Sequence, residues 1–198
     1  MIKTMQGFRI FTESKADIKF LKDYIEEIFG NTLSDAYFDP LGSWSGYKTG
    51  GNLIASIRQN HDDKKIPILI LDADSDFKSR EKEVIQDFKS YEIPAKLFLF
   101  PNHSANGNLE TLLSEIAINR KIMNCFLEYE TCVAGHPKPL NDSRIYSYLD
   151  MLLFPNPKDN NGKDLRKEEF RNYRNAEHWN LKHEYLNPLS QFLQPFLQ

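Results

Sequence analysis

The chain has 198 residues, 40% of them hydrophobic, so it is long enough to bury a core and too apolar to be disordered. Its 25 basic and 28 acidic residues give a net charge of −3, which excludes a protein that holds nucleic acid through overall positive charge alone. The sequence has no apolar run of about 18 residues, no signal-like amino terminus and only two cysteines, so it predicts a cytoplasmic protein without a membrane span.

The first part of the chain predicts a strand, a helix and a second strand. Residues 8–12, FRIFT, are typical of a short buried strand. Ser14 then offers a helix cap, apolar residues follow at helical spacing, and Gly30 ends the helix. A short strand is expected around residues 36–38, followed by a glycine-rich loop and by a helix that Asn52 caps.

The next part continues the alternation of strands and helices. Residues 66–71, IPILIL, predict a central buried strand, and a charged helix is expected over about residues 79–91. The apolar run AKLFLF after Pro94 predicts a further strand, and Asn108 caps the helix LETLLSEIAI. This alternation indicates an α/β fold, with a Rossmannoid parallel sheet flanked by helices.

The last 80 residues have a different pattern, because strand signals fade after about residue 118 and helical ones remain. The segments RKIMNCFLEYE and SRIYSYLDMLLF are helical, and a polar loop at residues 155–164 precedes an apolar carboxy-terminal stretch. We expect an α/β domain over residues 1–118 and a helical extension over residues 119–198, either packed on the sheet domain or forming a small cap.

Acidic residues gather where the predicted strands end. Asp72, Asp74 and Asp76 follow the central strand, Glu13 follows the first strand, and Glu110 lies in the first turn of the helix after the last strand. Parallel strands align their carboxyl ends along one edge, where ligands of such sheets bind, so these groups are expected to converge. Carboxylates this close repel one another, and a divalent cation with a preference for hard oxygen ligands would relieve the repulsion.

The run DADSD has other interpretations. Its spacing matches an EF-hand loop, but Phe77 stands where that loop needs glycine, and the preceding segment is a strand instead of a helix. A strand that ends in Asp-x-Asp also occurs in haloacid-dehalogenase phosphatases, but normally as the first strand of the fold. The plainest alternative is a solvated acidic loop that caps the next helix.

The order of three motifs resembles that of Toprim domains. FTESKADIKFLKDYI is similar to their first motif, a strand followed by a glutamate, a small turn and an aspartate that opens a helix. LILDADSD is similar to their second motif, and FLFPNHSANGNLETLL to a segment of uncharacterised bacterial Toprim-like proteins, some of them near the overcoming-lysogenization-defect nucleases. The resemblance covers about residues 8–118, and WNLKHEYLNPLSQFL is similar to the end of the same uncharacterised group. The sequence departs from the family at Ser14, where Toprim domains usually have glycine.

The resemblance implies chemistry on nucleic-acid phosphodiesters with Mg²⁺, or Mn²⁺, as the cofactor. Asp72 and Asp74 would hold the cation, and Asp76 and Glu110 would support a second one. Glu13 would act as a general acid or base, or as a ligand of the second ion. Toprim domains of primases, topoisomerases and nucleases act on phosphodiesters, so nucleic acid is the implied partner.

Four further residues are candidates for binding a substrate phosphate: Lys15, Lys78, Arg80 and His103. For each of them, an ordinary solvated side chain is the competing interpretation. Two functions therefore follow from the sequence. One is a metal-dependent nuclease, and the other is a non-catalytic Toprim-like module that binds metal or a partner within a larger assembly.

Overall fold

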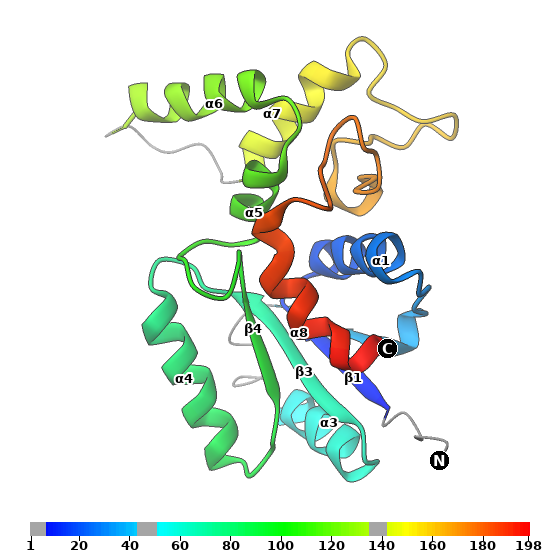
Figure 1. The fold of residues 1–198 in the computed structure, drawn as a ribbon, viewed down its shortest axis with the longest axis vertical. Coiled ribbons are helices and arrows are strands. Elements are labelled where there is room, and N and C mark those ends of the chain that lie inside the picture. The colour runs from blue at the N-terminus through cyan, green and yellow to red at the C-terminus, as the bar shows by residue number, and fades with distance from the viewer. Residues whose placement is uncertain (1–6, 43–50, 135–141) are drawn as a thin grey trace.

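A computed structural model of the chain describes residues 7–42, 51–134 and 142–198 (Figure 1). Its centre is a four-stranded sheet in which all neighbouring strands are parallel, in the order β2-β1-β3-β4. The strands are β1 (Phe8–Thr12), β2 (Phe38–Pro40), β3 (Ile66–Asp72) and β4 (Lys96–Phe100). The α-helices are α1 (Lys15–Phe29), α3 (Gly51–Asp62), α4 (Phe77–Ser90), α5 (Leu109–Ile116), α6 (Arg120–Cys132), α7 (Asp142–Leu153) and α8 (Asn187–Leu197). Three short 3₁₀ turns are η1 (Asp35–Tyr37), η2 (Glu168–Phe170) and η3 (Glu184–Leu186).

The sheet is covered on both faces, as the apolar sequence of β3 requires. Ile68 and Ile70 lie in one buried cluster with α1, α5, α7 and α8, whereas Leu69 and Leu71 lie in a second cluster with α3 and α4. The sequence of a strand that is buried on both sides is a continuous apolar run, because neither face of the strand contacts water. The predicted α/β fold, a Rossmannoid parallel sheet flanked by helices, is confirmed.

Helix α1 begins and ends where its sequence predicts. The Ser14 hydroxyl accepts a hydrogen bond from the Asp17 N–H (3.2 Å), and Asp17 Oδ2 accepts one from the Ser14 N–H (2.8 Å), which forms a capping box. Gly30 ends the helix in the left-handed conformation with φ of 71°. Ser14 itself has an extended backbone with φ of −135°, so this turn does not need the glycine that Toprim domains usually carry.

The remaining predicted elements differ from the structure mainly at their ends. Strand β3 extends to Asp72, one residue beyond the predicted run, because the pairing with β4 continues to Phe100. Helix α4 begins at Phe77 because Asp76 caps it. Most of the predicted glycine-rich loop, residues 43–50, and the Asn52 side chain lie outside the described residues.

The last third of the chain runs away from the sheet and returns to it. Helices α6 and α7 pack on each other at one end of the molecule, and α8 lies along the sheet on the face that α1 also covers (Figure 1). Aromatic contacts hold α8 on the sheet. The ring centroid of Phe192 lies 5.4 Å from that of Phe98 in β4, and the ring centroid of Phe196 lies 6.2 Å from that of Phe8 in β1. The division at residue 118 stays a prediction. None of the helices in the described part of the chain is long and apolar enough to cross a bilayer.

Candidate functional site

The strand order places a switch point between β1 and β3. The chain leaves β1 for β2 on one side and later enters β3 on the other side of β1. Ligands of open parallel sheets bind outside the carboxyl ends of the strands at such a point. Glu13 follows β1 directly and Asp72 is the last residue of β3, so two of the predicted site residues occupy this position.

Hydrogen bonds join these two residues to the start of α5. The Asp72 N–H donates to Glu13 Oε1 at 3.0 Å, and Asp72 Oδ1 accepts the N–H of Leu109, the first residue of α5, at 3.2 Å. The carboxylate of Asp72 therefore satisfies one of the unpaired N–H groups at a helix start, where the helix dipole favours negative charge. The ends of β1 and β3 and the start of α5 form one connected unit.

A pocket of about 260 Å³ opens at this unit, and we call it the acidic pocket. Five of the residues that line it carry carboxyl groups: Glu13, Asp17, Asp72, Glu110 and Glu168. They come from the end of β1, the first turn of α1, the end of β3, the first turn of α5 and the turn η2. The expected convergence of Glu13, Asp72 and Glu110 is therefore present among residues far apart in the sequence.

The carboxyl groups of the acidic pocket disturb one another. Burial raises the pKa of Asp72 well above its usual value, and the charges of Asp17, Glu13, Glu110 and Asp74 raise it further. Asp17 is only 5% exposed, and this burial raises its pKa to about 7, although hydrogen bonds with Ser14 act in the opposite direction. Negative charge is therefore costly here, which is the condition under which a cation binds favourably.

The chemistry of the pocket suits a hard divalent cation, but its side chains are not arranged around one. Carboxylate oxygens are the ligands that Mg²⁺ and Mn²⁺ prefer. Within the described ranges, however, no three carboxylate, histidine or cysteine side chains are placed so that they could hold a metal ion together. The oxygens of Glu13 and Asp72 instead accept backbone N–H groups.

Asp74 lies beside the acidic pocket, in the loop after β3, and backbone hydrogen bonds join this loop to the loop after β4. Its backbone has a positive φ of 54° and exchanges two hydrogen bonds with Gly107, from the loop after β4, at 2.8 and 2.7 Å. Arg80 pairs with the Asp74 carboxylate and donates from Nε to the Asp72 carbonyl at 3.1 Å. Arg80 is only 7% exposed and holds this loop, and its predicted contact with substrate phosphate stays a prediction.

Asp76 has the helix-capping role that the sequence left open as an alternative. Its Oδ1 accepts the N–H of Ser79 at 3.0 Å at the start of α4. The Asn106 side chain crosses between the two loops, because it accepts from Phe77 N–H at 2.9 Å and donates to the Ser75 carbonyl at 2.7 Å. Asp76 is not among the described residues that line the acidic pocket.

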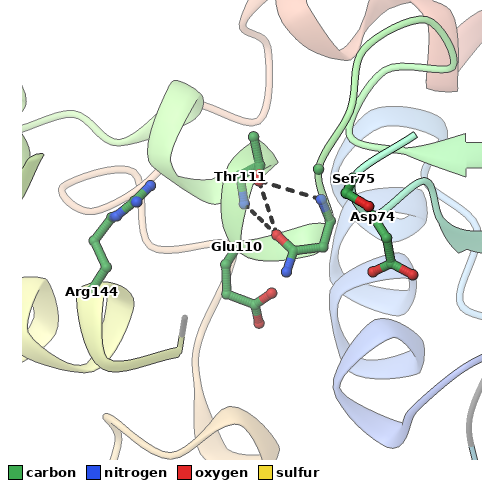
Figure 2. A pocket seen from close by; sticks show the side chains of 7 residues that line it. Asp74, Ser75, Glu110, Thr111 and Arg144 are labelled. Atoms are coloured by element: carbon green, nitrogen blue, oxygen red, sulfur yellow. Dashed lines mark hydrogen bonds between the residues drawn. The ribbon is translucent and has the colours of Figure 1, made fainter. Parts of the chain in front are cut away.

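A second pocket of about 400 Å³ also has Glu110 in its lining, and we call it the Arg144 pocket (Figure 2). Its lining consists of Asp74, Ser75, Gly107, Asn108, Glu110, Thr111 and Arg144. Figure 2 shows Arg144 projecting from α7 on one side and Asp74 and Ser75 on the other, with Glu110 between them. Glu110 lines both pockets, so the two are adjacent.

The three other candidate phosphate ligands lie elsewhere. Lys15 and Lys78 are exposed in the first turns of α1 and α4, and neither is among the described residues that line the two pockets. His103 stacks on Phe98 at 5.2 Å, and its Nδ1 accepts the N–H of Leu99 at 3.1 Å. Burial lowers the pKa of His103, which favours the neutral ring that this hydrogen bond requires.

Three charged residues of the two pockets were not predicted as site residues. Asp17 carried a signal, because an acidic residue three positions after Ser14 forms a capping box at the start of α1, beside Glu13. Glu168 and Arg144 carried none, since they belong to the part of the sequence without strand signals. Only the folded chain brings them to the edge of the sheet.

Comparisons of this chain with protein-family models, with curated proteins and with solved structures found no match. The fold and site define a class, a parallel α/β protein with an acidic pocket at the switch point of its sheet. The resemblance to Toprim domains stays a prediction that rests on the three sequence motifs.

Proposed function

We propose that the protein is a Mg²⁺- or Mn²⁺-dependent enzyme that processes nucleic-acid phosphodiesters at a Toprim-like active site. One observation carries the proposal: carboxyl groups from two adjacent strand ends and two helix starts line one pocket at the switch point of the sheet, where burial and their mutual repulsion raise the pKa of Asp72. A cation stabilises such a group of charges, and the motifs that resemble Toprim domains supply the same residues.

In this proposal Asp72 and Glu110 hold the cation, with Asp74 beside them. The ion, when bound, neutralises charge on the phosphoryl group. Glu13 takes a proton from the attacking water or gives one to the leaving oxygen, and its hydrogen bond with the Asp72 N–H holds it beside the metal ligands. Because no three of the described side chains converge as they stand, cation binding would require a new rotamer for Glu110, while Glu13 keeps its hydrogen bond with the Asp72 N–H.

A second candidate function is a non-catalytic Toprim-like module. The observation that favours it is the same satisfied arrangement, in which the oxygens of Glu13 and Asp72 already accept backbone N–H groups. In that case Asp72 serves to hold the start of α5 against β3, and the protein catalyses no reaction at the acidic pocket.

Metal binding and strand cleavage together distinguish the two candidates. Mn²⁺ is titrated by calorimetry into the wild type, into Asp72→Asn and into Glu128→Gln, a control at an exposed position of α6. We expect Asp72→Asn to lose most of the affinity and Glu128→Gln to keep it. At free Mn²⁺ about 100 times the dissociation constant, the wild type should gain about 2.7 kcal/mol in free energy of unfolding.

The same three proteins are then tested on labelled single- and double-stranded DNA and RNA in Mn²⁺. Cleavage by the wild type and by Glu128→Gln, but not by Asp72→Asn, supports the enzyme. Metal binding without any cleavage supports the module instead. A wild type that neither binds Mn²⁺ nor melts at a higher temperature in millimolar Mn²⁺ rules out the metal-dependent function.

A further inference from the structure

The acidic pocket and the Arg144 pocket are adjacent, and their linings differ in charge. Glu110 belongs to both linings, so the acidic pocket and the Arg144 pocket meet at this residue. Four other carboxyl groups lie on the acidic side, and Arg144 is the single cationic side chain among the described residues that line either pocket. Beside the shared Glu110, the Arg144 pocket therefore presents one guanidinium and the Asp74 carboxylate, which pairs with Arg80.

The guanidinium of Arg144 is held in a fixed orientation. Its Nε donates to Glu130 Oε1 at 2.9 Å, its Nη2 pairs with the other oxygen of Glu130, and its Nη1 donates to Ser114 Oγ at 3.3 Å. Contacts with described residues thus engage three of the five N–H donors of an arginine. The side chain is 22% exposed, so the remaining donors face a partly desolvated space, where an arginine binds phosphate well.

The wall opposite Arg144 is equally fixed. The loop of Asp74 and Ser75 is held by the two backbone hydrogen bonds between Asp74 and Gly107. On the α5 side, Asn108 Oδ1 accepts both the Thr111 N–H (3.0 Å) and the Thr111 hydroxyl (2.9 Å). A pocket with this volume and these rigid polar walls is suited to a polar group of defined shape.

We propose that the Arg144 pocket takes a second phosphate of the nucleic-acid strand whose neighbouring phosphodiester is processed in the acidic pocket. The inference rests on the proposed function for the identity of the acidic pocket. It adds a substrate class, because a strand with successive phosphates reaches both pockets, whereas an isolated phosphodiester reaches one. Arg144 is then a residue that determines specificity for strands.

A comparison of two substrates tests this assignment. Arg144→Gln, Arg144→Lys and the control Arg174→Gln, which removes an arginine paired with Glu26, are assayed in Mn²⁺. For a labelled single-stranded oligonucleotide we expect Arg144→Gln to raise KM about tenfold or more and Arg144→Lys to raise it less. For bis(4-nitrophenyl) phosphate, which has one phosphate, kcat/KM should stay unchanged in all three variants. Equal losses on both substrates would overturn the inference.

A binding measurement separates this inference from the proposed function. Fluorescence anisotropy of the same oligonucleotide is recorded over a range of salt concentrations, in EDTA and in Ca²⁺. Loss of one phosphate contact should lower the slope of log affinity against log salt by about 0.7 in Arg144→Gln. If the wild type binds no metal and cleaves nothing but shows this difference, the proposed function fails and the phosphate contact stands. If the wild type does not bind the oligonucleotide, or Arg144→Gln binds it with unchanged affinity and slope, the inference is wrong.

Glu130→Gln reports on the structural part of the Arg144 interactions. This variant removes the charge that pairs with Arg144 but keeps the arginine, so we expect oligonucleotide binding to be retained even where the melting temperature falls. Arg144→Lys serves as the charged variant if Arg144→Gln does not fold. Should Glu130→Gln weaken oligonucleotide binding as much as Arg144→Gln, Arg144 acts only by joining α6 to α7 and the assignment is wrong.

Discussion

Asp72 is subject to two opposing influences. The N–H of Leu109 donates to its carboxylate at the start of α5, which favours the charged form. Burial and the charges of Asp17, Glu13, Glu110 and Asp74 favour the neutral form. The pKa of Asp72 is raised well above its usual value, so burial and repulsion outweigh the hydrogen bond. The same balance acts on Asp17, whose pKa has a value that can be tested.

Asp17 should make the stability of the metal-free protein fall as pH rises. Its pKa is about 7 in the folded chain against 3.8 for an ordinary aspartate, so the folded state binds the proton more tightly. Its contribution is therefore full below about pH 4 and is lost as pH rises through about 7, and it amounts to a few kcal/mol in total. Urea midpoints from pH 4 to 8 should fall less steeply for Asp17→Asn than for the wild type. The pKa of Asp72 is also raised, so the urea midpoint of Asp17→Asn should still fall with pH, but with a smaller slope than that of the wild type.

The exposed variant Asp62→Asn, at the end of α3, serves as the control for this pH series and should follow the wild type. Parallel curves for the wild type and Asp17→Asn would show that Asp17 is ionised in the folded state throughout this range.

Glu13 and Asp72 should differ in what their variants lose. In the proposed mechanism Glu13 moves a proton and Asp72 holds the ion, so Glu13→Gln should keep most of the Mn²⁺ affinity that Asp72→Asn loses. Turnover of the oligonucleotide by Glu13→Gln should fall by roughly 10²- to 10⁴-fold, the usual contribution of a general acid or base. Calorimetry and cleavage assays on both variants measure this. Equal loss of metal affinity in the two would make Glu13 a ligand.

At the scale of elements, the loops after β3 and β4 position the site. They are joined by the backbone bonds between Asp74 and Gly107 and by the Asn106 side chain, so the starts of α4 and α5 are fixed relative to each other. Gly107 has a φ of 132°, and a Cβ there would lie 2.6 Å from Thr111 Oγ1. Both the backbone conformation and the close approach of α5 therefore require glycine at this position.

Gly107→Ala should destabilise the protein more than an ordinary glycine replacement at positive φ. Gly162 is the matched control, because it has a φ of 77° and a Cβ at this position would meet no atom within 4 Å. Gly162→Ala should cost about 1 kcal/mol in free energy of unfolding from backbone strain alone. Gly107→Ala adds the clash with Thr111 and should cost roughly 3 kcal/mol, as measured by urea denaturation. Equal costs would mean that α5 can shift away from the loop.

At the scale of the whole molecule, the carboxy-terminal segment is part of the same core as the sheet. Leu189, Leu193 and Leu197 of α8 are buried in the cluster that contains α1 and one face of the sheet. The Asn31 side chain donates to the Leu197 carbonyl at 2.8 Å, and the Tyr24 hydroxyl donates to the Leu186 carbonyl at 3.3 Å. The two predicted parts of the chain therefore share apolar contacts and hydrogen bonds.

Leu193→Ala should destabilise the whole chain in one cooperative transition. Leu193 is 1% exposed, and replacement of a buried leucine by alanine costs about 2–5 kcal/mol. Gln191→Ala, at an exposed position of the same helix, is the control. Circular dichroism and amide exchange in β3 and α7 should report the same loss. If β3 keeps its protection while α7 loses it, residues 1–118 form an independent domain.

Local patterns predicted most elements of the sheet domain and part of its site. The apolar run of residues 66–71 predicted β3, Ser14 and Gly30 fixed the ends of α1, and strand-end carboxylates indicated Glu13, Asp72 and Glu110. These features depend on residues close in sequence, such as a cap and the turn that it begins, or on the general rule that parallel strands share one carboxyl edge.

Only the tertiary structure decided the order of the strands and the division of roles among the charged residues. Asp76 and Asp74 look alike in the sequence, yet one caps α4 and the other pairs with a buried Arg80. Glu168 and Arg144 reach the pockets because residues after 118 fold back on α1 and α5. Such contacts join residues far apart in the chain through packing and burial, and no local pattern of amino acids encodes them.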